Sequence, residues 1–299
     1  MKYSGIGGQA VIEGIMMMKG EDYAVAVRRP DKEIEVKKDT YQSITKKAKI
    51  LQLPFVRGVF RFADSMIIGM RSLSYSASFF EDDEDAEPGK FEQLLDRVFG
   101  EKLESAIMAA VLVISFILAI GIFMLLPLGI ANLFKGVITS DHLMAVLEGV
   151  IRIAIFIIYI KLVSRMEDIR RTFMYHGAEH KCINCVEHGH PLTVKYVRES
   201  SKEHKRCGTS FILIVMVISI LMFMVIRVDT IWMRILSRII LVPVIAGISY
   251  EILQCAGRSN SKFMDLVSRP GMWMQGLTTK EPDDSMIEVA IAATEAENT

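Results

Sequence analysis

Histidine, cysteine and glutamate side chains are concentrated in one stretch of this 299-residue chain. Five of the six histidines and three of the four cysteines lie within or beside residues 161–207. His176, Glu179 and His180 have the H-x-x-E-H spacing of inverted zinc-peptidase motifs. On a helix the two histidines would share one face and could bind one Zn²⁺, with Glu179 as general base. A third ligand would come from His204 or Cys207, which one helical turn could present together.

The same stretch allows a second metal site. Cys182-x-x-Cys185, with His188 and His190, could form a small closed zinc knot that is structural rather than catalytic. The alternative is that both cysteines are ordinary small residues of a loop.

Apolar residues make up 51% of the chain and the mean hydropathy is +0.33, although 23% of the residues are charged. This combination indicates that apolar and charged residues are segregated along the chain. Four apolar stretches are long enough to predict membrane-spanning helices, at residues 106–134, 143–160, 208–226 and 239–256. The fold class predicted is a mainly α polytopic membrane protein with about four spans.

Basic residues predict which side of the membrane each connection occupies. Sixteen Lys and Arg residues precede residue 106, ten lie in residues 161–206 and four follow residue 257. By the positive-inside rule these three regions, and therefore both termini, are cytoplasmic. Cytoplasmic thiols are kept reduced, so a disulfide is not expected.

Ionisable side chains also fall within the predicted spans. Glu148 and Arg152 are four residues apart and can pair inside the membrane. Glu251 lies near the cytoplasmic end of the fourth span, as His204 and Cys207, with Arg206 between them, do near the third. These residues predict either a polar site at the cytoplasmic mouth of the bundle or ion pairing that holds the helices in register.

The remaining chain predicts a small cytoplasmic module. Residues 9–15, 23–27 and 33–36 are expected to be strands, the last two joined by a Pro-Asp turn as a hairpin. Residues 54–80 have helical spacing, which fits a helix on the membrane surface or one packed on the strands. The predicted regions are 1–80, the β-containing module; 81–104, an acidic linker and lead-in helix; 105–257, the membrane domain with loop 161–207; and 258–299, a cytoplasmic tail.

Five motifs then become recognisable in order along the chain. They are Gly7-Gly-Gln-Ala-Val-Ile-Glu-Gly-Ile-Met-Met, Tyr175-His-Gly-Ala-Glu-His-Lys, His204-x-Arg-Cys-Gly-Thr-Ser-Phe, Tyr250-Glu-x-Leu…Ala256-Gly, and Pro270-Gly-Met-Trp-x-Gln…Thr278-Thr-Lys-Glu-Pro-Asp. Together they resemble the YqhQ-like family of bacterial multi-pass membrane proteins, a domain of unknown function. The resemblance implies a metal-dependent enzyme whose typical residues correspond to His176, Glu179, His180, His204, Arg206, Cys207 and Glu251. Cys182 lies outside the family pattern, which counts against the zinc knot.

The balance of 35 basic and 35 acidic residues argues against a nucleic-acid partner. We therefore expect a protein of the bacterial plasma membrane whose first partner is the lipid bilayer. The leading hypothesis is a zinc-dependent hydrolase with its site at the cytoplasmic face. The alternative is a non-enzymatic scaffold or assembly factor that acts on other membrane proteins. A transporter is a third and weaker hypothesis, because no internal repeat is visible.

Overall fold

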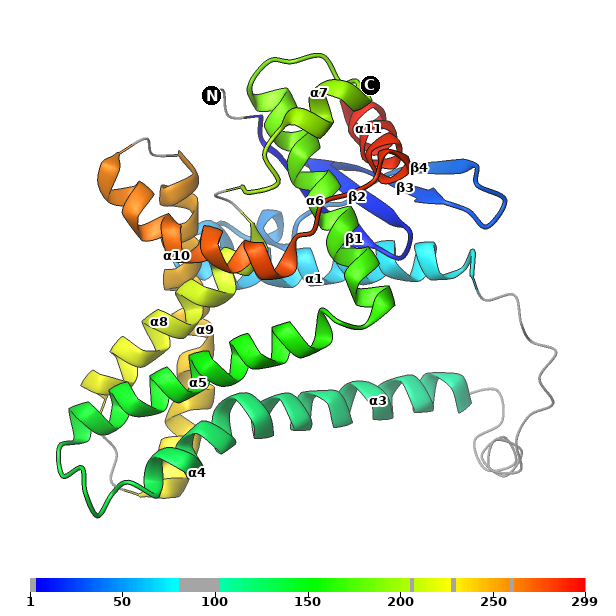
Figure 1. Ribbon diagram of the computed structural model, residues 1–299. Helices are drawn as coiled ribbons and strands as arrows, with labels where there is room; N and C mark the ends of the chain where they lie inside the picture. Colours follow the sequence, from blue (N-terminus) through cyan, green and yellow to red (C-terminus); the bar gives the residue numbers. More distant parts are fainter. Residues whose placement is uncertain (1–3, 81–102, 205–206, 227–229, 259–260, 299) are drawn as a thin grey trace. The chain divides into compact units, whose positions relative to one another are not determined.

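The computed structural model describes residues 4–80, 103–204, 207–226, 230–258 and 261–298 (Figure 1). The chain forms two compact units, one made of Met1–Phe80 and Ile160–Thr299 and the other of Glu81–Tyr159. The N-terminal strands, the His- and Cys-rich stretch and the C-terminal segment therefore belong to the same unit.

The unit Glu81–Tyr159 is helical in its described part. Helix α3 (Leu103–Ile120) continues through a π-helical turn, η4 (Gly121–Leu125), into α4 (Leu126–Asn132), and α5 (Asp141–Val163) begins after a short connection. Pro127 lies in the first turn of α4. Proline cannot donate to the preceding turn and clashes with it, which accounts for the π-helical turn just before.

The larger unit contains an antiparallel four-stranded sheet of order β1-β2-β3-β4. Its strands are β1 (Ile6–Val11), β2 (Gly14–Lys19), β3 (Asp22–Arg28) and β4 (Ile34–Thr40). The hairpin of β3 and β4 around the Pro-Asp turn is confirmed. The predicted strand at residues 9–15 is wrong, because Val11 pairs with Gly14 and Ile12 and Glu13 form a turn in its middle.

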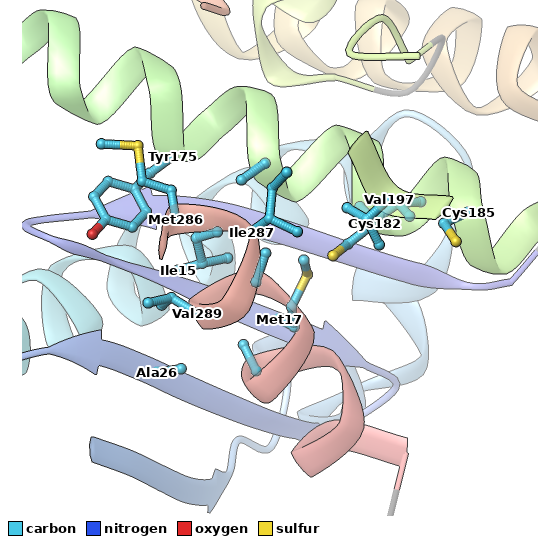
Figure 2. Packing of buried hydrophobic residues seen from close by; sticks show 14 of the residues in the cluster. Ile15, Met17, Ala26, Tyr175, Cys182, Cys185, Val197, Met286, Ile287 and Val289 are labelled. Carbon is cyan, nitrogen blue, oxygen red and sulfur yellow. The ribbon is translucent and has the colours of Figure 1, made fainter. Parts of the chain in front are cut away.

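Helices cover both faces of this sheet. On one face α6 (Glu167–Glu187), α7 (Val194–Glu199) and α11 (Asp284–Asn298) pack against side chains such as Ile15 and Met17 (Figure 2). On the other face Ile68 of α1 (Val56–Ala77) packs against Met16 and Val25. Successive strand residues point to opposite faces, so the alternating pattern supplies both cores. The predicted helix at residues 54–80 is confirmed, and it packs on the strands.

The rest of the described part of this unit is helical. Two 3₁₀ turns, η1 (Ile44–Lys47) and η2 (Lys49–Gln52), lead into α1. Helices α8 (Gly208–Val225) and α9 (Ile231–Arg258) pack together, α10 (Lys262–Thr278) packs on α8, and α1 packs on α9.

Four helices are long and apolar enough to cross a membrane. The candidate spans are Val113–Asn132, Asp141–Val163, Gly208–Val225 and Leu236–Gly257. They coincide with the four predicted stretches, so the fold class of a mainly helical membrane protein with a small N-terminal sheet is confirmed. The orientation of the termini and the choice of the plasma membrane stay predictions.

Candidate metal centre

The motif residues lie on α6, a continuous helix in which Glu167 and Asp168 favour the N-terminal end through their charge. Gly177 lies within this helix where the chain between α10 and α11, residues 279–283, crosses it closely. We call these residues the crossing segment. A Cβ atom on Gly177 would lie 2.0 Å from the backbone oxygen of Lys280. The Lys280 amide also donates to the backbone oxygen of Phe173 at 2.8 Å. The glycine that weakens helix propensity is thus the residue that allows this contact.

Three of the four predicted metal ligands converge. One ligand atom each of His176, His180 and Cys207 lies within 4.8 Å of the others. The Cys207 Sγ atom is 3.2 Å from His176 Nε2 and accepts a hydrogen bond from the Thr209 amide at 3.4 Å. Cys207 is the N-cap residue of α8, so its sulfur lies where the helix dipole favours a negatively charged atom.

Backbone carbonyl groups orient both imidazole rings. His176 Nδ1 lies 3.0 Å from the Thr278 oxygen, and His180 Nδ1 lies 2.7 Å from the Lys202 oxygen. A carbonyl oxygen only accepts, so each Nδ1 carries the hydrogen and each Nε2 keeps its lone pair for a metal ion. Burial also lowers the pKa of His180, which favours the neutral ring that metals require.

Glu179 is buried beside this cluster. A Cβ atom added to Gly8 of β1 would lie 2.8 Å from Glu179 Cγ, so the glycine leaves room for the carboxyl group. Burial raises the pKa of Glu179 to about 7, and the nearby His176 lowers it less strongly. Its Oε2 atom makes no hydrogen bond with any residue that the structure describes. A carboxyl group with such a pKa can take up and release a proton near neutral pH.

Residues that the sequence analysis did not single out hold the loop that carries the Lys202 carbonyl. Lys181 Nζ donates to the oxygens of Arg198 and Ser200 at 2.8 and 2.9 Å. Asn184 Nδ2 donates to the oxygens of Ser201 and Glu203 at 2.7 and 2.9 Å. Both donors lie on α6, and Lys181 ends the second of the five motifs, which is the sequence signal that could have identified it.

His204, the fourth predicted ligand, has a different neighbour. Its Nε2 atom is 3.4 Å from Glu187 Oε2. The backbone of His204 is clamped by Gln275, whose Oε1 accepts from the His204 amide at 2.9 Å and whose Nε2 donates to its oxygen at 2.6 Å. Gln275 belongs to the last of the five motifs. Arg206 lies outside the described residues.

The other predicted polar residues form ion pairs. Glu251 of α9 accepts from Arg57 Nε at 2.7 Å and so joins α9 to α1. Glu148 and Arg152 pair within α5 at 2.6 Å, as their spacing predicts. The Glu251–Arg57 pair joins two helices, whereas the Glu148–Arg152 pair lies within a single helix.

The cysteines and histidines of the alternative zinc knot are dispersed. Cys182 lies in the apolar cluster between α6, the sheet and α11 (Figure 2), and burial raises the pKa of its thiol. Cys185 Sγ contacts the backbone oxygens of His190 and Pro191 at 3.8 and 3.6 Å. In the described part of the chain, neither thiol belongs to a group of three close ligand atoms.

Comparison with known proteins places this chain among proteins of undetermined function. Residues 53–298 match the family described as Protein of unknown function (DUF1385). The chain is 34% identical over 286 residues to Uncharacterized protein YqhQ of Bacillus subtilis (strain 168), covering 95% of this chain and 89% of that protein. No solved structure matches. The resemblance drawn from the five motifs is confirmed, and the chain belongs to the DUF1385 family.

Proposed function

We propose that this membrane protein binds a zinc ion through His176, His180 and Cys207, and that it is a zinc-dependent hydrolase. The observation that carries the proposal is the approach of the three ligand atoms to within 4.8 Å of one another. Two imidazole nitrogens and one thiolate are a donor set typical of zinc. The carbonyl groups of Thr278 and Lys202 supply the outer hydrogen bonds that usually orient metal-binding imidazoles.

The chemistry follows from three protein ligands and one buried carboxyl group. His176, His180 and Cys207 would hold the zinc ion, which when bound would supply Lewis acidity to a carbonyl or phosphoryl group. Glu179 accepts the proton of the attacking water and returns it to the leaving group. Its raised pKa suits both steps near neutral pH. We place the site on the cytoplasmic side, where the positive-inside rule puts residues 161–206 and where thiols stay reduced.

A second candidate function is a scaffold in which the same metal ion is structural. The burial of the cluster favours it, because His180 and Cys207 are 1% and 5% exposed. A closed site would tie α6 to the beginning of α8 and would position the sheet module on the spans for contacts with other membrane proteins. The two functions make different demands on Glu179, which only the hydrolase needs as a proton carrier.

Metal analysis of the purified full-length protein tests the site. We expect one zinc per chain and, after exchange for Co²⁺, a sulfur-to-cobalt charge-transfer band that is lost in Cys207→Ala. His176→Ala with His180→Ala should abolish stoichiometric metal. His188→Ala with His190→Ala is the matched control, because these two rings stack on each other and neither belongs to the group of three close ligand atoms. Equal metal content in the two double variants would refute the site.

Glu179→Gln separates the hydrolase from the scaffold. It should keep the metal and the charge-transfer band, because glutamine is similar in size and Glu179 is not one of the three ligands. In the hydrolase it should fail to complement a deletion strain, whereas in the scaffold it should complement as wild type does. Loss of metal in Glu179→Gln would show instead that this carboxylate is a ligand.

A further inference from the structure

Helix α10 exposes large apolar side chains along one side. Phe263, Leu266 and Trp273 are 68%, 59% and 62% exposed and recur at spacings of three and seven residues. Exposed Lys262 and Arg269 flank this apolar stripe. The opposite side of α10 is buried and packs on α8. An amphipathic helix that keeps its apolar side uncovered in the described structure needs an apolar partner.

Helix α1 has a second stripe of the same kind. Phe62, Met66, Met70 and Leu73 are 47%, 52%, 44% and 38% exposed at spacings of four, four and three residues. The opposite side packs on the sheet through Ile68. Arg61 and Arg71 are also exposed on α1, and the guanidinium of Arg71 lies over the Tyr41 ring. The acidic residue of α1, Asp64, is buried and accepts from the Tyr41 hydroxyl at 2.9 Å, so the exposed side of α1 carries only positive charge.

Both helices are fixed to the same end of the α8–α9 pair. Gly58 of α1 and Gly247 of α9 allow close backbone contact, since a Cβ on Gly247 would lie 2.4 Å from the Phe55 oxygen. The rings of Phe62 and Phe211 lie 5.6 Å apart between α1 and the beginning of α8.

Helix α10 meets the same end of α8. A Cβ on Gly271 would lie 2.6 Å from Ser210 Oγ. Ser210 and Phe211, which meet α10 and α1, lie in the first turn of the candidate span Gly208–Val225, whereas α1 meets α9 at Gly247, inside the candidate span Leu236–Gly257.

We propose that α1 and α10 are interfacial helices that lie in the surface of the bilayer at this end of α8 and α9. Their apolar stripes continue the lipid-facing surface of the spans, and their basic residues face anionic headgroups. Lipid is favoured over a protein partner because two separate helices bear stripes at the same membrane end. Trp273 and the flanking Lys262 and Arg269 are residue types typical of the membrane interface.

One consequence concerns the His176, His180 and Cys207 cluster, although the inference does not depend on a metal. Cys207 caps α8, so the cluster lies at the level where the span leaves the bilayer. Interfacial α1 and α10 would hold the cluster against the membrane surface. A site held there meets molecules that are themselves inserted in the membrane.

Tryptophan fluorescence of the full-length protein in vesicles of phosphatidylethanolamine and phosphatidylglycerol tests the proposal. The chain has two tryptophans, so Trp232→Phe leaves native Trp273 as the reporter. We expect nitroxide-labelled phospholipids to quench Trp273 several-fold more strongly than acrylamide does. A chain with Met66→Trp, Trp232→Phe and Trp273→Phe should behave in the same way for α1.

The matched control places the reporter on α7 by combining Tyr196→Trp with Trp232→Phe and Trp273→Phe. Tyr196 is 37% exposed and far along the chain from both stripes. Acrylamide should quench this reporter and labelled lipid should not. Trp273 quenched by acrylamide as strongly as the control would show that α10 faces water. Trp273 protected from both quenchers would show that a protein covers α10. Either result overturns the proposal.

Discussion

Two sets of cysteine and histidine residues lie on α6 and its neighbours, and the structure gives them opposite surroundings. His176, His180 and Cys207 bring ligand atoms together within 4.8 Å. Cys182 and Cys185 are fully buried, and both lie in the apolar cluster formed with the sheet and α11. In the sequence the two sets interleave and both have metal-ligand spacing.

The difference arises because residues two positions apart point to different sides of a helix. Cys182 follows His180 by two residues, which places the two side chains on nearly opposite sides of α6. The His180 side meets Cys207 and the carbonyl of Lys202, whereas the Cys182 side packs in the apolar cluster with the sheet and α11, where Thr294 is its hydrogen-bonding neighbour. The neighbours of a helix face therefore decide whether a thiol there can be a ligand or only a packing group.

The largest expected effect tests this contrast directly, by removing one thiol from each set. Cys207→Ala should weaken zinc binding by more than about 100-fold, because loss of a ligand exceeds the usual cost of losing an outer hydrogen bond. Cys182→Ala should leave zinc affinity unchanged. Competition with a chromogenic chelator measures both. Similar affinities for the two variants would mean that the convergence of the three ligand atoms has no role in metal binding.

Gly177→Ala should disturb the cluster of His176, His180 and Cys207 indirectly, by displacing a neighbouring segment. The new methyl group would meet the Lys280 oxygen at 2.0 Å, so the crossing segment must move, and Thr278 carries the carbonyl that orients His176. Zinc affinity should fall by about 10- to 100-fold, the usual effect of losing an outer hydrogen bond to a ligand.

Gly276→Ala is the matched control for Gly177→Ala, because a Cβ there meets nothing within 4 Å. The same chelator competition compares the two variants. Unchanged zinc affinity in Gly177→Ala would show that the Thr278 carbonyl does not position His176 for a metal ion.

A smaller effect, on stability rather than on zinc affinity, is expected for substitutions of Cys182 and Cys185. Cys182→Ser places a more polar hydroxyl group in a cluster where Thr294 is the hydrogen-bonding neighbour of this side chain, and should lower the free energy of unfolding by about 1 kcal/mol or more. Cys185→Ser should cost less, because its hydroxyl could donate to the oxygens that Cys185 Sγ already contacts. Thermal unfolding in detergent compares the two, and a larger loss in Cys185→Ser would contradict the assignment of Cys182 to the core.

Local sequence patterns predicted a large part of the fold. The spans at Val113–Asn132 and Gly208–Val225 were predicted from runs without charge, and α1 from its helical spacing. The turn at Ile12 and Glu13 was missed because it has no glycine, proline or asparagine. Glu13 adopts a positive φ of 47° and forms an ion pair with Arg171, a contact distant in sequence.

The sequence predicted only the part of the candidate site whose residues lie close together along the chain. His176, Glu179 and His180 follow from helix periodicity, but the convergence of Cys207 with the histidines depends on contacts distant in sequence, among them those that hold residues 198–204. Lys181, Asn184 and Gln275 fix that path through bonds to backbone oxygens, which have no pattern in the sequence. The packing of α11 on the sheet likewise joins segments more than 250 residues apart.

The smallest expected effect concerns the ion pair of Lys181 on α6 with Glu281 of the crossing segment, whose contribution to stability should depend on pH. Burial alone would raise the pKa of Glu281, but the hydrogen bond and charge of Lys181, together with the charge of Lys202, outweigh it and lower the pKa below 4.5. Stabilisation by this carboxylate is therefore present above its unfolded-state pKa and is lost as pH falls through the lower folded-state pKa. Glu281→Gln should lower the free energy of unfolding by less than about 1 kcal/mol at neutral pH, because the carboxylate is largely exposed.

The difference in stability between Glu281→Gln and the wild-type protein should vanish in acid, where wild-type Glu281 is also neutral. Melting temperatures measured from neutral pH down to strongly acidic pH follow it, with Glu199→Gln, at the exposed end of α7, as the charge-matched control. A deficit that stayed constant with pH would show that Glu281 acts through packing. The crossing segment would then be held by the Gly177 contact and by the hydrogen bond of the Lys280 amide to Phe173.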